Sequence, residues 1–190
     1  MGIALNHPAE GTVNWAGTVG ANFTTLQNQY VARIKGDTTS ASVSGTTSET
    51  LLMANTTVKA NTFAAGSVIP VWACGFIQVP ANAAPTITWR LRWGGLSGVQ
   101  LANVTFRPNT STSAQVFIWT ADVRLFCATA GSSGTVDSEG WLMPGSLVQT
   151  LLSTGLSTID TTADKVLCWT GQTTVSTVTI TQDNMATNLG

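Results

Sequence analysis

Residues 86–93 read Thr-Ile-Thr-Trp-Arg-Leu-Arg-Trp, and the strict alternation of this stretch decides the fold class. Every second position is large and apolar, occupied in turn by Ile87, Trp89, Leu91 and Trp93. Successive side chains of a β-strand point to opposite faces, so the pattern predicts a strand with one buried and one solvated face. Such strands are typical of antiparallel sheets that cover a core on one side only.

The same period recurs along the chain. Residues 114–127 place apolar side chains on one face (Phe117, Trp119, Ala121, Val123, Leu125 and Cys127) and a more polar set on the other (Ile118, Thr120, Asp122 and Arg124). Residues 67–79 are apolar on both faces, which predicts a central strand or one pressed against a neighbouring subunit. Shorter candidate strands begin at residues 50, 99, 140, 147, 165 and 174, with turn signals such as Pro80, Gly94-Gly95 and Gly171 between them. About eight strands without an intervening helix predict a mostly β fold, an antiparallel sandwich of the jelly-roll or a similar Greek-key kind, over residues 49–190.

The N-terminal part follows a different period. Apolar side chains fall at steps of four, three, four and four, at Val19, Phe23, Leu26, Tyr30 and Ile34. This spacing predicts one amphipathic helix, which Gly36-Asp37 would stop. An isolated helix of about 17 residues is marginal in water, so its stripe is expected to pack against copies of itself or a partner. We therefore predict a segment with a helix at 1–35, a Gly/Ser/Thr-rich linker at 36–48, and the sandwich at 49–190.

Composition excludes several classes of partner. The chain of 190 residues has 8 Lys+Arg, 9 Asp+Glu and a net charge of -1, so it lacks the basic surface that nucleic acid or anionic lipid requires. No run approaches the roughly 18 apolar residues of a membrane span, so membrane insertion is not expected. Cys74, Cys127 and Cys168 each lie in an apolar stretch, so they are predicted to be buried free thiols. Their odd number and an N-terminus without the features of a secretory leader argue against a disulfide framework, and synthesis in the cytoplasm is expected.

Catalytic residues are scarce. The only histidine, His7, precedes Pro8 in the N-terminal segment. It is remote from the predicted sandwich and cannot complete a Ser-His-acid arrangement there. The close acidic pairs, Asp137 with Glu139 and Asp160 with Asp164, are predicted to be surface charges in loops rather than a glycosidase pair. No phosphate-binding or dinucleotide-binding glycine motif occurs, and one histidine offers little to a zinc site. We expect no enzyme activity, no cofactor and no metal.

Seven tryptophans invite the alternative of a saccharide platform. Trp89, Trp93 and Trp119 share strand faces with other apolar residues, which predicts that they belong to the core. For Trp72, Trp141 and Trp169, whose faces are less clear, a place in the core or a subunit interface is favoured over a ligand platform.

Residues 7–27 contain a two-part sequence motif. Gly11, Thr12, Asn14 and Trp15 form a Gly-Thr-x-Asn-Trp element, and Gly20, Ala21, Asn22 and Phe23 follow it. This stretch resembles the opening of bacteriophage fibre-type virion proteins, in which Asn-Ala-Asn-Phe enters a helix, and the first Asn is replaced here by Gly20. The resemblance implies a homotrimer with a jelly-roll head, held to other virion proteins of the tail, baseplate or capsid. It assigns virion anchoring to Thr12, Asn14, Trp15, Asn22 and Phe23, and helix self-association to Val19, Phe23, Leu26, Tyr30 and Ile34.

The leading functional hypothesis is a trimeric tail fibre, made in the bacterial host cytoplasm and incorporated into the virion. Its head would attach to the host surface, with a cell-surface glycan as a candidate partner. One alternative keeps the fold and makes the chain a capsid head fibre or decoration protein. Another is a free lectin-like binding module. Candidate receptor-binding loops are residues 80–85, 107–113, 129–138 and 153–164.

Overall fold

A computed structural model describes residues 34–37, 40–52, 56–145, 149–150, 152–153 and 155–188. The chain divides into two units, Met1–Ile34 and Lys35–Gly190, and the second holds the sandwich. Within the described ranges every regular element is a strand, and no helix is long and apolar enough to cross a membrane. The strands are β1 (Ile34–Asp37), β2 (Ala41–Val43), β3 (Thr50–Leu51), β4 (Thr56–Val58), β5 (Val68–Val79), β6 (Ile87–Trp93), β7 (Val99–Phe106), β8 (Gln115–Thr129), β9 (Gly134–Pro144), β10 (Gln149–Thr150), β11 (Leu152–Ser153), β12 (Ser157–Ile159), β13 (Lys165–Thr173) and β14 (Thr179–Asn188).

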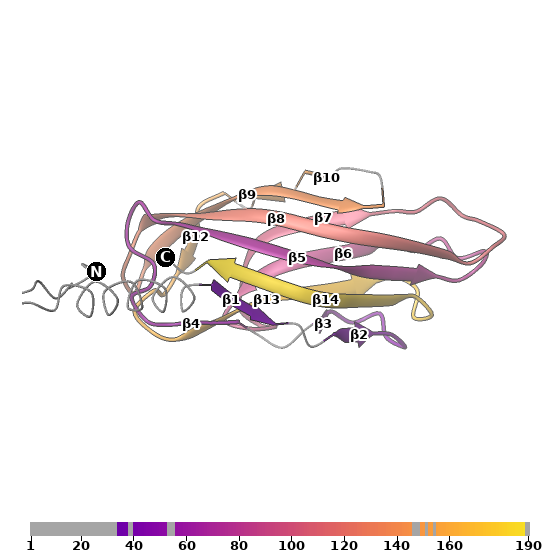
Figure 1. Ribbon diagram of the computed structural model, residues 1–190, viewed down its shortest axis with the longest axis horizontal. Helices are drawn as coiled ribbons and strands as arrows, with labels where there is room; N and C mark the ends of the chain where they lie inside the picture. Colours follow the sequence, from indigo (N-terminus) through magenta and orange to yellow (C-terminus); the bar gives the residue numbers. More distant parts are fainter. Residues whose placement is uncertain are drawn as a thin grey trace, which may run out of the picture. The chain divides into compact units, whose positions relative to one another are not determined.

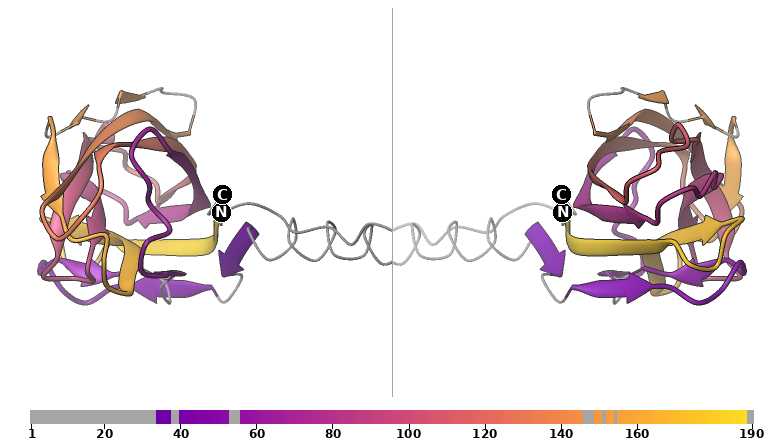
Figure 2. Two further views of the ribbon diagram at one scale, coloured as in Figure 1. Left: turned by 90° about the vertical axis from the view of Figure 1, so that its left-hand side faces the viewer. Right: turned by 90° about the vertical axis from the view of Figure 1, so that its right-hand side faces the viewer.

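Two sheets make up the sandwich (Figure 1). Sheet A has eight strands in the order β1-β14-β5-β8-β9-β10, with β2 also on β14 and β12 also on β9. Sheet B has six strands in the order β11-β7-β6-β13-β3, with β4 also on β13. The end-on views of Figure 2 show the strands of both sheets around a common interior. The predicted antiparallel two-sheet sandwich is thus confirmed.

The strand pairs are nested along the chain. The antiparallel ladders join β5 to β14, β6 to β13, β7 to β11 and β8 to β9, so early strands pair with late ones. Two further ladders, β5 with β8 and β6 with β7, link these pairs within each sheet. As a result β5 lies between β14 and β8, which confirms the central position predicted for residues 67–79.

Alternation along the long strands fills the interior as predicted. On β6 the four apolar side chains are buried, whereas Thr88, Arg90 and Arg92 are half-buried on the outer face. On β8 the residues from Trp119 to Cys127 that were assigned to the inner face are buried. Exchanging the faces by a one-residue slip would expose the entire core set, and this fixes the register.

Tryptophan rings occupy the centre of the core. Trp119 lies between Trp89 and Trp169, with ring centroids 5.8 and 6.5 Å away. Its indole Nε1 donates a hydrogen bond to the carbonyl oxygen of Thr181 at 2.9 Å, which links the core to β14. Trp93 is also buried and packs edge-on against Phe63 at 5.3 Å. The core positions predicted for Trp89, Trp93 and Trp119 are confirmed.

Two strands lie where the end of the helix and the linker were predicted. Ile34, predicted to end the helix, begins strand β1, and Gly36-Asp37, predicted to stop the helix, belongs to that strand. Part of the predicted linker is strand β2, which pairs with β14, and its Ser42 hydroxyl shares a 2.7 Å hydrogen bond with Thr181. The free backbone edge of β14 accounts for this, because small Ser, Thr and Ala side chains can extend along an open edge as readily as they form a linker.

Gly171, predicted to mark a turn, lies instead inside β13. A Cβ atom there would come within 2.8 Å of Leu52 Cδ2 and 3.2 Å of Ile180 Cδ1. The glycine is therefore required by close packing across the core and not by a turn.

Candidate binding site

The outer face of sheet A carries two exposed tryptophans beside a group of charged residues. In the strand register Trp72 of β5 lies opposite Asp122 of β8, and Asp122 lies opposite Trp141 of β9. Two residues along β8, Arg124 lies opposite Glu139. We call these five residues the tryptophan site.

The geometry of the tryptophan site follows from strand spacing. Neighbouring strands lie about 4.8 Å apart, so the backbones of Trp72 and Trp141 are about 10 Å apart with Asp122 between them. The two indoles are 42% and 37% exposed, although large aromatic side chains are normally covered. A shallow hollow of about 240 Å³ lies beside Trp141, lined by Asp122, Arg124, Glu139, Gly140 and Trp141.

Gly140 brings the two sides of the hollow together. A Cβ atom at this position would lie 2.2 Å from the carbonyl oxygen of Asp122 and 2.8 Å from Val123 Cα. Only glycine allows β9 to approach β8 this closely. The close approach sets Trp141 directly beside Asp122.

The charged side chains of the site are not engaged by other described residues. Within the described part of the chain, the side chains of Asp122, Arg124 and Glu139 make no hydrogen bond or ion pair, although Arg124 and Glu139 lie on adjacent strands. Two carboxylates and one guanidinium give the site a net charge of -1. The site therefore offers acceptors, donors and flat aromatic surface that are all available to a ligand.

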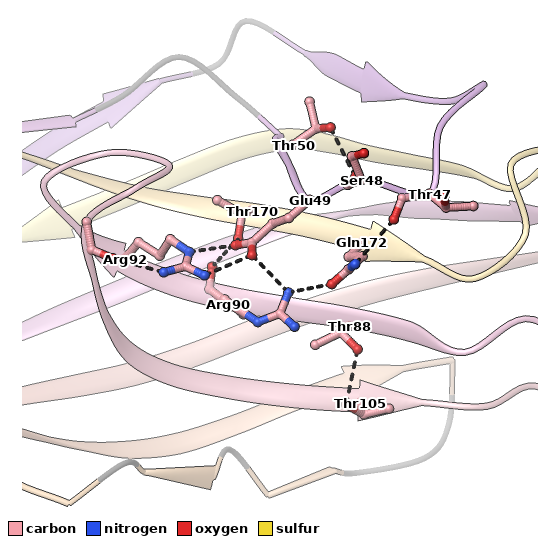
Figure 3. Close-up of polar contacts among 11 residues, drawn as sticks. Thr47, Ser48, Glu49, Thr50, Thr88, Arg90, Arg92, Thr105, Thr170 and Gln172 are labelled. Atoms are coloured by element: carbon pink, nitrogen blue, oxygen red, sulfur yellow. Dashed lines mark hydrogen bonds and ion pairs between the residues drawn. The ribbon is translucent and has the colours of Figure 1, made fainter.

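A second polar cluster behaves differently. On the outer face of sheet B, Glu49 accepts hydrogen bonds from Arg92 and Thr170, and its carboxylate lies 3.2 Å from Arg90 Nη1 (Figure 3). The same Arg90 nitrogen donates to Gln172 Oε1 at 3.0 Å. The side chains of Glu49, Arg90 and Arg92 are only 16–21% exposed.

The environment of Glu49 stabilises its charged form. Burial alone raises the pKa of a carboxyl group, but the hydrogen bonds from Arg92 and Thr170, together with the charges of Arg90 and Arg92, outweigh it and lower the pKa of Glu49. Each charged group in this cluster has a partner inside it, since Arg90 and Arg92 share the carboxylate of Glu49, and the cluster keeps a net charge of +1. We interpret the cluster as a latch that holds the segment before β3 on sheet B, and not as a ligand site.

The two acidic pairs have different outcomes. Asp160 and Asp164 lie in the loop between β12 and β13, as predicted, with Asp164 paired to Lys59 at 2.7 Å. The loop prediction for Asp137 and Glu139 is wrong, because both lie on the outward face of β9. The flanking glycines suggested a loop, whereas they permit tight strand pairing.

Most sequence-predicted site residues lie outside the described residues. These are His7 and the residues assigned to anchoring or helix self-association: Thr12, Asn14, Trp15, Val19, Asn22, Phe23, Leu26 and Tyr30. Of the helix stripe only Ile34 is described, and it lies in β1. Among the described residues no group of three or more His, Cys, Asp or Glu side chains could hold a metal ion.

The cysteines are free thiols, as predicted. Cys127 and Cys168 are buried and Cys74 is half-buried. Burial raises the pKa of Cys168 to about 11, which leaves its thiol protonated at neutral pH.

Sequence reasoning did not single out the tryptophan site. Trp169 is buried as favoured, but a core position for Trp72 and Trp141 is wrong. Asp137, Glu139 and Trp141 follow each other at steps of two, a signal that places Trp141 on the polar face of its strand. No comparable signal exists for Trp72, because residues 67–79 are apolar on both faces. The site also lies on a sheet face and not in the predicted receptor loops.

Comparisons with known proteins assign the chain to no family. No protein-family model and no curated protein matches the sequence. Among solved structures, the chain is similar to a legume lectin-like domain from Entamoeba histolytica, with a TM-score of 0.33 and 7% identity, over 85% of this chain and 92% of that one. A similarity at this level carries no argument about fold or function. The class of the protein is accordingly that of its architecture, a mostly β antiparallel sandwich of two sheets.

Proposed function

We propose that the chain is a structural virion protein of a bacteriophage, a tail fibre that presents the sandwich for attachment to the host surface. The observation that carries the proposal is the tryptophan site, where two exposed indoles flank charged side chains that have no partner among the described residues. A soluble protein gains no stability from such an arrangement, since exposed rings and unpaired charges contribute little to folding. Aromatic residues in this setting are typical of recognition surfaces. The role is binding, not catalysis.

In this proposal the N-terminal segment holds the chain in the virion. The support is the sequence resemblance over residues 7–27, which includes Thr12, Asn14, Trp15, Asn22 and Phe23. The sandwich contributes the head, in which ion pairs such as Glu49 with Arg92 hold some of the charged residues and the tryptophan site carries others.

The finer architecture of the head is part of the proposal. We assign it to the jelly-roll kind, which the nested ladders of β5 with β14 and β6 with β13 support. We also assign a homotrimer. Its support is the exposed apolar pair Val116 and Ile118 on sheet A, 65% and 69% exposed, which a neighbouring copy would cover. Three copies would give weak sites the avidity needed on a repetitive cell surface.

Immunogold labelling of phage particles that carry this chain tests the proposal. Antibody against residues 49–190 is expected to label the tail. The Trp15→Ala variant should be lost from particles, whereas Trp72→Ala, a tryptophan change outside the anchor, should be incorporated normally. Gold spread over the capsid would replace the tail fibre by the decoration alternative. Absence of the chain from particles would favour a free binding module.

A further inference from the structure

The tryptophan site has the chemistry of a saccharide-binding surface. Sugars present a face of C–H groups and a rim of hydroxyl groups. An exposed indole offers a flat apolar surface on which the C–H face of a sugar can stack. Trp72 and Trp141 provide such a surface on each side of Asp122. The hollow beside Trp141 is open and shallow enough to admit a sugar ring from the surface.

Hydroxyl groups donate and accept at once, so a sugar site needs both kinds of partner. The carboxylates of Asp122 and Glu139 only accept hydrogen bonds, and the guanidinium of Arg124 only donates them. All three side chains lack partners among the described residues. These side chains are partly hydrated before binding, so hydrogen bonds to a sugar replace hydrogen bonds to water. The binding free energy gains because the three side chains are already held in place on adjacent strands.

The charge balance narrows the class of sugar. With two carboxylates against one guanidinium, the site repels anionic groups such as carboxylate or sulfate. Arg124 in turn disfavours an organic cation, which would otherwise suit indole rings beside a carboxylate. A neutral saccharide meets neither repulsion.

We infer that the tryptophan site binds a neutral saccharide, with Trp72 and Trp141 stacking on sugar faces and Asp122 accepting hydrogen bonds from hydroxyl groups between them. Arg124 and Glu139 complete the rim on one side. This inference deepens the proposed attachment function and rests on it only in making the sugar part of a host surface.

Binding of the full chain to an oligosaccharide array tests the inference. The array carries neutral oligosaccharides of glucose, galactose, mannose and N-acetylglucosamine, beside sialylated, uronic-acid-containing and sulfated ones. We expect binding to at least one neutral oligosaccharide and weaker binding to its anionic counterparts. Trp72→Ala and Trp141→Ala should each weaken that binding at least about tenfold, because each removes a stacking surface. Asp122→Asn should weaken it as well.

Val68→Ala is the matched control. Val68 lies on the same outward face of β5 as Trp72 and is 44% exposed, but it lies four residues from Trp72 and has no part in the proposed contact between copies. Its removal should leave saccharide binding unchanged, which separates the site from general adhesion of an apolar surface. Light scattering of each variant monitors assembly, and the variants at the site should keep the mass of the parent protein.

Several results would overturn the inference. These are no binding to any neutral oligosaccharide, binding that survives Trp72→Ala, equal loss in Val68→Ala, or displacement of the sugar by choline chloride. A change of mass in Trp72→Ala would make this surface a contact between copies instead. Cleavage of the bound oligosaccharide would show catalysis. None of these results depends on where the chain lies in a virion, so failure here and failure of the immunogold experiment are separate outcomes.

Discussion

Removing the charge of Glu49 is expected to destabilise the protein in a way that depends on pH. Glu49→Gln keeps the shape of the side chain but replaces one carboxylate oxygen with an amide nitrogen. That nitrogen would face a guanidinium donor of Arg92, whose Nη2 now donates to Glu49 Oε2 at 2.8 Å. The hydrogen bonds that remain would lose the assistance of the negative charge.

The structure sets the magnitude. Glu49 accepts two hydrogen bonds from Arg92 and one from Thr170, and bonds to a charged group are worth about 1 kcal/mol more than neutral ones. The side chains are about one-fifth exposed, so solvent screening reduces the sum of about 3 kcal/mol slightly. We expect a loss of about 2–3 kcal/mol at pH 7. For a chain of this length that corresponds to a decrease in Tm of about 5–10 °C.

The loss of stability in Glu49→Gln should be largest at neutral pH and smaller in acid. Because the pKa of Glu49 is lower in the folded than in the unfolded protein, its stabilisation is present above the unfolded pKa of about 4.3 and is lost as pH falls through the folded pKa. Denaturant unfolding of the parent protein and Glu49→Gln at pH 7 and at a series of lower pH values should therefore show a gap in unfolding free energy that narrows as the solution becomes acidic. Glu139→Gln is the control, since it removes the same charge without a partner and should stay within about 0.5 kcal/mol. A gap below about 0.5 kcal/mol at pH 7, or one that persists in acid, would refute the role of the charge.

Two further predictions concern the interior. Gly171→Ala should lower the unfolding free energy by about 1–3 kcal/mol, because its Cβ would overlap Leu52 Cδ2 at 2.8 Å. Gly66→Ala, at an open position, should show only the cost of its positive φ, and denaturant unfolding measures both variants. A thiol reagent at pH 8 should leave Cys127 and Cys168 unmodified in the native protein and modify all three cysteines after unfolding, and rapid native labelling of Cys168 would contradict its burial and raised pKa.

Periodicity predicted the strands well wherever one face is wet. Residues 86–93 and 114–127 alternate strictly, and their buried and outward faces were predicted residue by residue. Prediction was poorer where the local pattern is ambiguous. Gly171 and the glycines around Asp137 suggest turns on sequence grounds, and only close packing between distant strands explains them.

The candidate site could be predicted only in pieces. The alternation of β8 already places Asp122 and Arg124 outward, and the spacing from Glu139 does the same for Trp141. Bringing them together with Trp72 requires the register of β5 on β8 and of β8 on β9. That register depends on contacts across the whole sandwich, and a single sequence does not record them.

The nesting of early and late strands governs how the chain reaches its native state. Gln78 of β5 pairs with Thr179 of β14, about one hundred residues later in synthesis. At about 5–20 residues per second, β5 waits about 5–20 s on the ribosome before its partner is made. Through that interval the apolar strand β5 has an open edge, which exposes the nascent chain to aggregation. Closure of sheet A thus waits for the synthesis of β14, and a chain cut before residue 179 lacks the partner strand of β5.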